Sequence, residues 1–397
     1  MKKYPLMPAQ IYLPKSDFAR WSVVACDQFT SQPEYWDEVE KIVGDCPSTL
    51  KITLPEIYLS GDVEARIGAI NANMEKYLSE GVISARENAM IYVERQMSDG
   101  STRCGIVGAI DLEDYDYHIG SKTPIRATEK TVLERIPPRV KIRENASLEL
   151  PHVLLMIDDP KKTVVEAIGA VKDRFEKAYD VELMMGGGRI VGYFLDDDAI
   201  AMVGEALEAM KTDDGMLFAV GDGNHSLATA KACYQKNPTP ASRYALVEVV
   251  NTHSEAIVFE PIYRVVFNVD PAALKKALIA ACGESGASDA QKFEILTADG
   301  RETVSLCPAS KLPVGTLQGF LDEYLPACPG AEIDYIHGTD VVEQLCKKEN
   351  TIGFIFEGMQ KDELFAAVEQ DGSLPRKTFS MGQARDKRYY MECRKIK

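Results

Sequence analysis

Residues 218–231 read FAVGDGNHSLATAK, an apolar run that stops at Gly-Asp-Gly-Asn-His-Ser before an alanine-rich pattern begins. The apolar run predicts a strand over 216–221, and the alanine-rich pattern predicts a helix over 224–235. Gly221 and Gly223 lack a Cβ atom, which permits positive φ angles and a close approach of the backbone to a ligand. A strand, a glycine turn and a helix N-terminus in this order present free N–H groups, so the stretch predicts an anion site.

Four polar side chains accompany this turn. His225 and Ser226 offer hydrogen-bond donors to a phosphate group, and Asp222 could hold a metal, orient His225 or accept a hydroxyl proton. The alternative is structural, with Asp222 or Asn224 capping the helix and His225 packing beside it. The residues alone give these two interpretations equal weight.

The chain as a whole is a globular protein of the mixed α/β class. Its 397 residues exceed what one compact core holds, so we predict two domains. The first covers residues 1–267 and contains the glycine turn, and the second is a smaller α/β domain over 268–397, where the pattern of strands and helices restarts. The basic, aromatic stretch from residue 374 onward is a tail that either docks on a domain or stays loose.

Local patterns assign further elements. We expect helices over 62–79, with Asp62 as the cap, and over 163–180, 199–211 and 271–282. We expect strands over 21–26, 89–95 and 104–110, the last two joined as a hairpin. The glycines of 186–188 lead into a strand without a following Gly-Lys-Ser/Thr, so they are more typical of a hairpin or β-turn than of a phosphate loop.

Charge, cysteines and hydropathy limit the partners. Lys and Arg total 45 against 61 Asp and Glu, and the net charge of -16 argues against nucleic acid as the main partner. The nine cysteines are scattered without a Cys-x-x-Cys pair, which indicates reduced thiols in the cytoplasm. No run approaches the roughly 18 apolar residues of a membrane span. His118, His152, His253 and His337 are isolated in the sequence, so we expect structural roles for them, with His337 in IDYIHG as a partial exception.

The loop resembles the Asp-Gly-His-His-Arg signature of the domain-of-unknown-function family DUF1015. That signature is in turn similar to the phosphate-binding loop shared by sulfiredoxin, ParB-like CTP-binding proteins and ADP-dependent free-serine kinases. Further blocks of the chain resemble the family in the same order, namely IRATEKTVLERIPPRVKIREN (125–145), YALVEVVN (244–251), PIYRVVF (261–267), IDYIHG (333–338) and LPRKTFSMGQARDKRYY (374–390). The resemblance implies a ParB/sulfiredoxin-like N-terminal domain.

The chain departs from the family pattern at four positions. Asn224 stands where the signature has a histidine, and Ser226 stands where it has an arginine that would bind phosphate bidentately. Thr128 and Tyr263 likewise occupy positions of family histidines. These departures imply a weaker hold on phosphate, for which the basic residues of 126–143 could compensate.

The resemblance implies a set of site residues. Asp222, His225 and Glu129 would be the catalytic groups, with Asp222 or Glu129 as the base. Binding of the nucleotide and its phosphates would fall to Gly221, Gly223, Asn224, Ser226, Arg126, Arg139, Arg143, Arg264, Lys377 and Thr378.

The resemblance to free-serine kinases implies a nucleotide-dependent phosphotransferase that acts on a small, serine-like hydroxyl metabolite. Its cofactors would be ATP or ADP with Mg²⁺, and its partners small molecules only. Two alternatives stay open: a hydrolase of a phosphorylated metabolite that uses the same pocket, and a non-catalytic sensor of a nucleotide or metabolite.

Overall fold

The computed structural model describes residues 3–211 and 215–397 and divides into two compact units. Unit 1 extends to Ile257 and includes Gly382–Lys397, whereas unit 2 is Val258–Met381. The division differs from the predicted boundary at 267/268, because β13 (Glu260–Phe267) pairs with strands of unit 2. The basic tail divides between the units, and its last part docks on unit 1.

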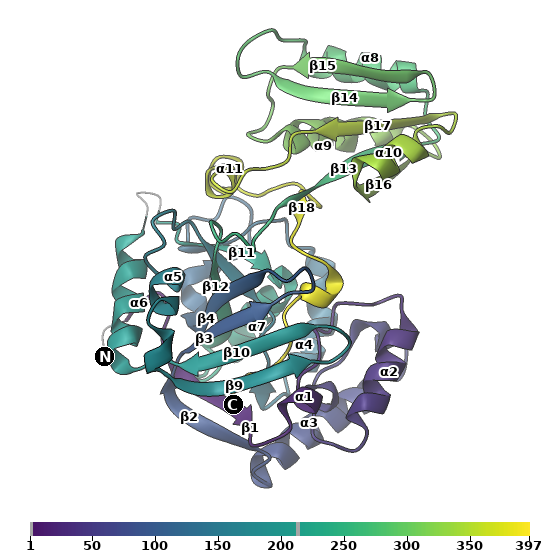
Figure 1. Cartoon of the computed structure of the whole chain (residues 1–397). Helices are drawn as coiled ribbons and strands as arrows, with labels where there is room; N and C mark the ends of the chain where they lie inside the picture. The colour runs from purple at the N-terminus through teal and green to yellow at the C-terminus, as the bar shows by residue number, and fades with distance from the viewer. Residues whose placement is uncertain (1–2, 212–214) are drawn as a thin grey trace. The chain divides into compact units, whose positions relative to one another are not determined.

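Unit 1 is built on a mixed sheet whose nine strands, among the residues that the structure describes, have the order β5, β6, β11, β8, β12, β4, β3, β10 and β9. Figure 1 labels β11, β12, β4, β3, β10 and β9 of this sheet. The bounds are β3 Ile91–Gln96, β4 Thr102–Asp111, β5 Tyr115–Asp116, β6 Ile125–Ala127, β8 Leu154–Ile157, β9 Glu176–Leu183, β10 Gly188–Phe194, β11 Phe218–Asp222 and β12 Tyr244–Asn251. Strand β11 runs parallel to β6 and antiparallel to β8. The predicted mixed α/β class is therefore confirmed.

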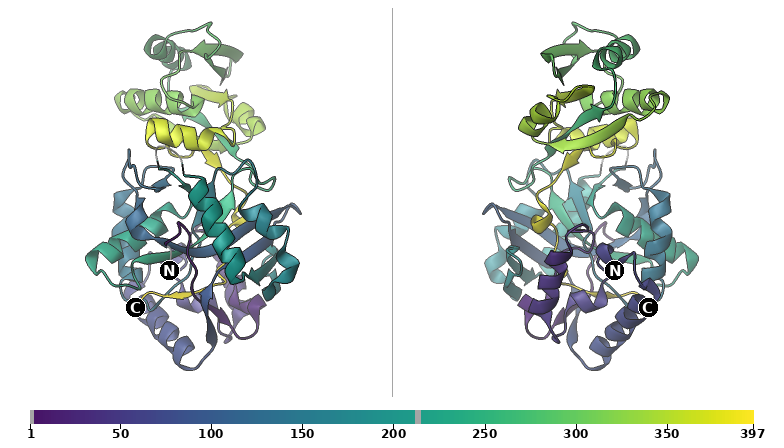
Figure 2. Two further views of the ribbon diagram at one scale, coloured as in Figure 1. Left: turned by 90° about the vertical axis from the view of Figure 1, so that its left-hand side faces the viewer. Right: turned by 90° about the vertical axis from the view of Figure 1, so that its right-hand side faces the viewer.

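Alternation along the strands supplies two cores, one on each face of the sheet. In β3, Ile91 and Val93 join a cluster that also includes the helices α1 (Phe18–Trp21), α2 (Pro33–Val43) and α3 (Val63–Ser79). Tyr92 joins the other cluster, which α5 (Val165–Gly169), α6 (Asp197–Ala209) and α7 (Asn224–Lys236) cover. The left view of Figure 2 shows α6, in teal, lying in front of this face.

Several sequence predictions for unit 1 are confirmed. Helix α3 begins after Asp62, whose side chain accepts a hydrogen bond from the Ala65 N–H at 3.1 Å. Strands β3 and β4 form the expected antiparallel hairpin. The three glycines lie at the turn between β9 and β10, which are also antiparallel neighbours.

Two predictions were wrong. Residues 21–26 are largely buried, but Trp21 ends α1 and only Val24 makes an isolated bridge, to Tyr389. In 163–180 the helix stops at Gly169, and the segment from Glu176 onward is β9. The buried Phe175 and Tyr179 lie four residues apart, a spacing that fits one face of a helix as well as of an extended segment.

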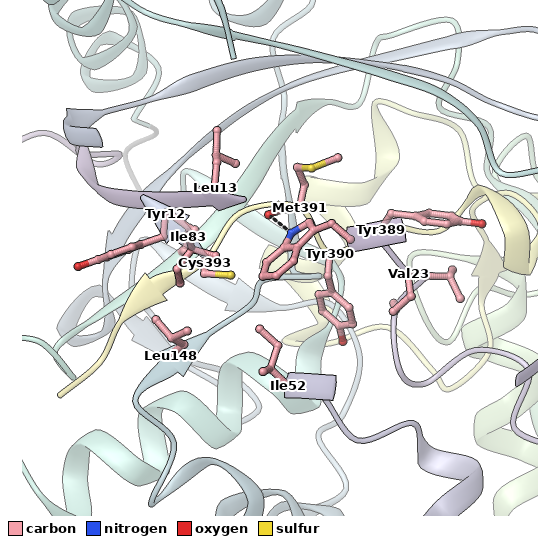
Figure 3. Packing of buried hydrophobic residues seen from close by; sticks show 14 of the residues in the cluster. Tyr12, Leu13, Val23, Ile52, Ile83, Leu148, Tyr389, Tyr390, Met391 and Cys393 are labelled. Carbon is pink, nitrogen blue, oxygen red and sulfur yellow. Dashed lines mark hydrogen bonds between the residues drawn. The ribbon is translucent and has the colours of Figure 1, made fainter. Parts of the chain in front are cut away.

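Two small sheets and the segment 382–397 complete unit 1. Strand β1 (Ala9–Pro14) pairs with β2 (Ile83–Ala89), and β19 (Arg394–Lys395) pairs with β7 (Leu148–Glu149). Tyr389, Tyr390, Met391 and Cys393 are buried in one cluster with Tyr12, Leu13, Val23, Ile52, Ile83 and Leu148 (Figure 3). The Trp21 indole N–H donates to the Met391 carbonyl at 2.9 Å.

A buried ion network holds this segment. The Arg388 guanidinium lies 2.7 Å from a carboxylate oxygen of Glu248 on β12 and 2.7 Å from one of Glu392, and it donates to the Pro151 carbonyl. All three charged side chains are at most 3% exposed. Because its carboxylate neighbours favour the charged guanidinium more than burial disfavours it, the pKa of Arg388 is raised.

Unit 2 has a sheet of its own, with the order β15, β14, β17, β13 and β16, and β18 pairs with β13. Its elements are α8 Pro271–Cys282, β14 Gln291–Thr297, β15 Gly300–Leu306, α9 Pro313–Tyr324, β16 Glu332–His337, α10 Thr339–Leu345, β17 Thr351–Phe356, α11 Glu363–Asp371 and β18 Phe379–Ser380. Helix α8 has the predicted bounds, and the Asp270 side chain caps it. Within the described ranges, no helix combines the length and apolar character that crossing a membrane requires.

We predict that Arg388→Met lowers the free energy of unfolding of unit 1 by about 3–5 kcal/mol, because it leaves Glu248 and Glu392 buried without their shared cation. Urea unfolding of the two proteins measures this difference. Arg385→Met, at an exposed position of the same segment, is the matched control and should change the value by less than about 0.5 kcal/mol. Equal effects of the two substitutions would contradict the prediction.

Candidate functional site

The predicted turn is present where β11 meets α7. Gly223 has φ 78° and is the N-cap of α7. A Cβ atom there would lie 3.0 Å from the Cα atom of Val153 and 3.4 Å from the His152 ring. Gly221 does not have positive φ, and a Cβ atom there would lie 2.8 Å from the Met156 side chain. A larger residue would therefore be strained at Gly223, whereas at Gly221 it would displace the Met156 side chain.

The carboxylate of Asp222 does not cap α7, which has no side-chain cap. One of its oxygens accepts from the Gly223 N–H at 2.9 Å, and the other lies 3.2 Å from the Lys387 ammonium group. The first backbone bond of the helix is made by Leu227, so the N–H groups of residues 224–226 have no acceptor within the described chain. This geometry favours the anion site over the capping interpretation.

His225 is a neutral imidazole at physiological pH. Its Nε2 atom accepts a hydrogen bond from the Val132 N–H at 3.3 Å, which leaves the ring proton on Nδ1. Burial, and then the positive charges of Arg139 and Arg135, lower the pKa of His225 to about 4. His225 can therefore donate one hydrogen bond from Nδ1 without carrying a positive charge.

Ser226 contacts a histidine that the sequence did not associate with the loop. Its Oγ atom lies 2.9 Å from Nε2 of His152, and the Nδ1 atom of that ring lies 2.8 Å from the Tyr390 hydroxyl. The Cys26 N–H donates to the same hydroxyl at 3.1 Å. His152 was expected to be structural because it is isolated in the sequence, and no local pattern links it to Ser226, 74 residues away.

Asp27 and Lys387 add opposite charges beside the loop. A carboxylate oxygen of Asp27 is 4.0 Å from Nε2 of His152. Burial raises the pKa of Asp27. Three neighbours lower it by more, namely His152, Lys387 and Gln28, which donates a hydrogen bond, so the pKa lies below its ordinary value. Lys387 thus lies near the carboxylates of Asp222 and Asp27, and it comes from the docked segment at the far end of the chain.

The start of the predicted basic segment lies beside the loop. Strand β6 places Arg126 opposite Ala219 of β11, where its side chain is 3% exposed and donates to the Thr123 carbonyl. The Thr128 hydroxyl donates to the Val220 carbonyl at 2.8 Å, and the half-buried Glu129 follows it in the chain.

The arginines of α4 (Ile136–Arg143) are paired with carboxylates. Arg139 binds Glu56, and Arg143 binds Glu149. Helix α4 packs along α7, and Arg143 lines a cavity of about 320 Å³ with Cys233, near the C-terminal end of α7. That end is roughly 13 Å from the loop along the helix axis, so the structure does not bring Arg143 to the glycine turn.

The three remaining residues predicted to bind the nucleotide lie in unit 2, and they are Arg264, Lys377 and Thr378. The fully buried Arg264 donates to the carbonyls of Arg376 and Lys377 at 2.8 and 2.9 Å and to the Gln318 side chain. The Thr378 hydroxyl donates to the Pro375 carbonyl. In unit 2, Arg264 therefore supports the backbone of this segment.

Comparison with known proteins identifies the class. Residues 6–395 match the family described as "Protein of unknown function (DUF1015)", so the chain belongs to that family. No curated protein matches it.

Similar solved structures include a free serine kinase in complex with AMP, at 12% identity over 73% of this chain and 92% of that one, with a TM-score of 0.42. A free serine kinase variant in complex with ADP gives a TM-score of 0.41 with the same identity and coverage. A conserved hypothetical protein from Pyrococcus furiosus gives 0.37, at 12% identity over 70% of this chain and 90% of that one.

We predict that Gly223→Ala destabilises unit 1 more than Gly120→Ala does. Both glycines have φ near 77°, so both substitutions should incur the roughly 1–2 kcal/mol cost of a left-handed alanine. Only at Gly223 does the added methyl group meet a neighbour, the Val153 backbone. Chemical unfolding measures both free energies, and equal losses would show that the close approach contributes nothing.

We predict that His225 makes unit 1 less stable as the pH falls. Because the folded-state pKa of about 4 is below the ordinary 6.5, only the unfolded chain takes up the proton between these values, so stability is lost over that window. His225→Gln should show a shallower decline in unfolding free energy, and His337→Gln, at an exposed position, should follow the wild type. Parallel curves for all three proteins would contradict the prediction.

Proposed function

We propose that unit 1 binds the phosphate groups of ATP or ADP at residues 221–226 and transfers a phosphoryl group to a small, serine-like hydroxyl metabolite. The observation that carries this proposal is the N-terminus of α7, where three backbone N–H groups, the Ser226 hydroxyl and Lys387 lie around one glycine turn. Helix N-termini of this kind bind phosphate through their N–H groups and dipole. We also propose that unit 1 is a ParB/sulfiredoxin-like domain, on the resemblance of the loop.

A second observation supports a ligand at this turn. The Oδ1 atom of Asn224 is buried, and no hydrogen-bond partner for it exists in the described chain. A buried acceptor without a partner costs free energy, which a bound donor would recover. An amide in place of the family histidine is thus suited to contacting a ligand.

The surroundings of the loop favour a nucleotide over a smaller phosphorylated metabolite. Val132 and Leu133 are 42% and 53% exposed, and the Val132 N–H binds His225. Large apolar side chains at the surface beside an anion site suit the flat apolar faces of a nucleobase.

Phosphoryl transfer requires positioning and charge neutralisation more than covalent chemistry. Lys387 would replace the missing arginine of the signature as the cation, and the N–H groups would hold phosphate oxygens. Glu129 or Asp222 would accept the proton of the acceptor hydroxyl, and Asp222 would also orient Lys387.

Magnesium fits this site only as a companion of the nucleotide. In residues 3–211 and 215–397 no three His, Cys, Asp or Glu side chains gather as a metal cage. Mg²⁺ usually needs one or two carboxylates together with substrate phosphates, and Asp222 could supply one. Its chemistry there would be to neutralise phosphate charge.

A non-catalytic sensor is the second candidate, because Arg139 and Arg143 are already bound to carboxylates and are not available to a transition state. Turnover separates the candidates. Nucleotide binding without phosphoryl transfer to any serine-like acceptor would favour the sensor, and phosphate release without nucleotide would favour a hydrolase.

Calorimetric titration of ATP, ADP and CTP, with and without Mg²⁺, tests the proposal. Lys387→Met should weaken binding about 10- to 100-fold, as expected for a lost charge-assisted hydrogen bond, whereas the exposed Lys130→Met should leave it unchanged. Asp222→Ala should abolish binding while the free protein melts near the wild-type temperature, since Asp222 does not cap α7. Absence of binding to any nucleotide would refute the phosphotransferase.

A further inference from the structure

We infer that Tyr390 and His152 are positioning residues that hold the Ser226 hydroxyl as a hydrogen-bond donor to a phosphate, so that Ser226 is not a nucleophile. The inference rests on the proposed function for the identity of the acceptor. It concerns a serine and a histidine in contact, an arrangement that in hydrolases often marks a nucleophile and its base.

The protons can be placed by accounting for each donor and acceptor. The Tyr390 hydroxyl accepts from the Cys26 N–H at 3.1 Å and lies 2.8 Å from Nδ1 of His152. Burial raises the pKa of Tyr390 well above its ordinary value, so the phenol keeps its proton and needs an acceptor. The Cys26 thiol is also within hydrogen-bond reach of this hydroxyl, but sulfur is a weak acceptor. Nδ1 of the neutral ring is therefore the preferred acceptor, which places the ring proton on Nε2.

The same result holds when the ring is charged. An imidazolium carries protons on both nitrogens, so Nε2 of His152 is a donor in that state as well. The carboxylate of Asp27, 4.0 Å from Nε2, also favours a proton at this atom. In both protonation states, therefore, a proton lies between Nε2 and Ser226.

The consequence for Ser226 follows from the 2.9 Å distance between its Oγ atom and Nε2. Because Nε2–H donates, Oγ accepts, and His152 cannot act as the base that removes the hydroxyl proton. The hydroxyl proton is left for another acceptor. Ser226 is the third residue of α7, beside the unpartnered N–H groups, so a phosphate oxygen bound there would receive it.

This arrangement also accounts for the departure from the family signature. An arginine at the position of Ser226 would bring its own charge and donors. A serine side chain is shorter than an arginine, and its hydroxyl can either donate or accept. A neighbouring group must therefore decide which of these two roles the hydroxyl takes. The buried chain from Cys26 through Tyr390 to His152 sets that role.

NMR of the uniformly ¹⁵N-labelled full-length protein tests the proton placement without any ligand. Long-range ¹H–¹⁵N correlations distinguish the two neutral tautomers, and His152→Gln assigns the signal. We expect the Nε2–H pattern or the charged pattern for His152 and the Nδ1–H pattern for His225, which serves as an internal contrast because its Nε2 accepts from Val132. An Nδ1–H pattern for His152 would overturn the inference.

Covalent labelling tests the role of Ser226. A fluorophosphonate probe followed by peptide mass spectrometry should leave Ser226 unmodified, and an adduct at Ser226 would overturn the inference. Ser226→Ala should weaken ADP binding roughly tenfold, as for a lost hydrogen bond, while Ser226→Thr, which keeps the hydroxyl, should restore most of it.

The outcomes separate the inference from the proposed function. If ADP binds and Ser226→Ala binds it equally well, the donor role is wrong although the function stands. If no nucleotide binds, the proposed function fails, and with it the phosphate as acceptor. The tautomer and the labelling results then decide alone whether Ser226 is a nucleophile.

Discussion

The buried contact of Arg388 with Glu248 and Glu392 is the interaction on which the rest of unit 1 depends. It fixes the last segment of the chain against the central strand β12. Two residues close to Arg388 in the chain belong to the candidate site: Lys387 lies beside Asp222, and the Tyr390 hydroxyl contacts His152. A structural ion network and the candidate site are therefore consecutive in sequence.

The site is assembled from four distant parts of the chain. Asp27 comes from the N-terminal region, His152 from the residues before β8, the glycine turn from 221–226, and Lys387 from the docked segment. Two histidines at this site have complementary roles. The Val132 N–H donates to Nε2 of His225, which makes that nitrogen an acceptor. The Tyr390 hydroxyl occupies Nδ1 of His152 instead, which leaves Nε2 of that ring as a donor.

Local chemistry made much of the fold predictable. Asp62 caps α3 as predicted, and α8 begins at Pro271, the residue predicted from the sequence. The glycine turn expected before α7 is also present, with positive φ at Gly223. The helix expected over 163–180 was wrong beyond Gly169, because the buried Phe175 and Tyr179, four residues apart, fit the helical and the strand period equally well. Arg264 and Lys377 were both predicted to bind the nucleotide, and in the structure they contact each other within unit 2, where Arg264 donates to the Lys377 carbonyl. His152, Asp27 and Lys387 could not be found, because only tertiary folding brings them to the loop.

The division of the chain also has a consequence for its synthesis. Unit 2 is inserted between two stretches of unit 1, and all of its strands are made before residues 382–397 emerge. Domains usually fold in order of synthesis, N-terminal first. Here unit 2 can complete its core while unit 1 still lacks Arg388, Tyr389 and Tyr390. Unit 1 is therefore the first unit to be synthesised and the last to complete its fold.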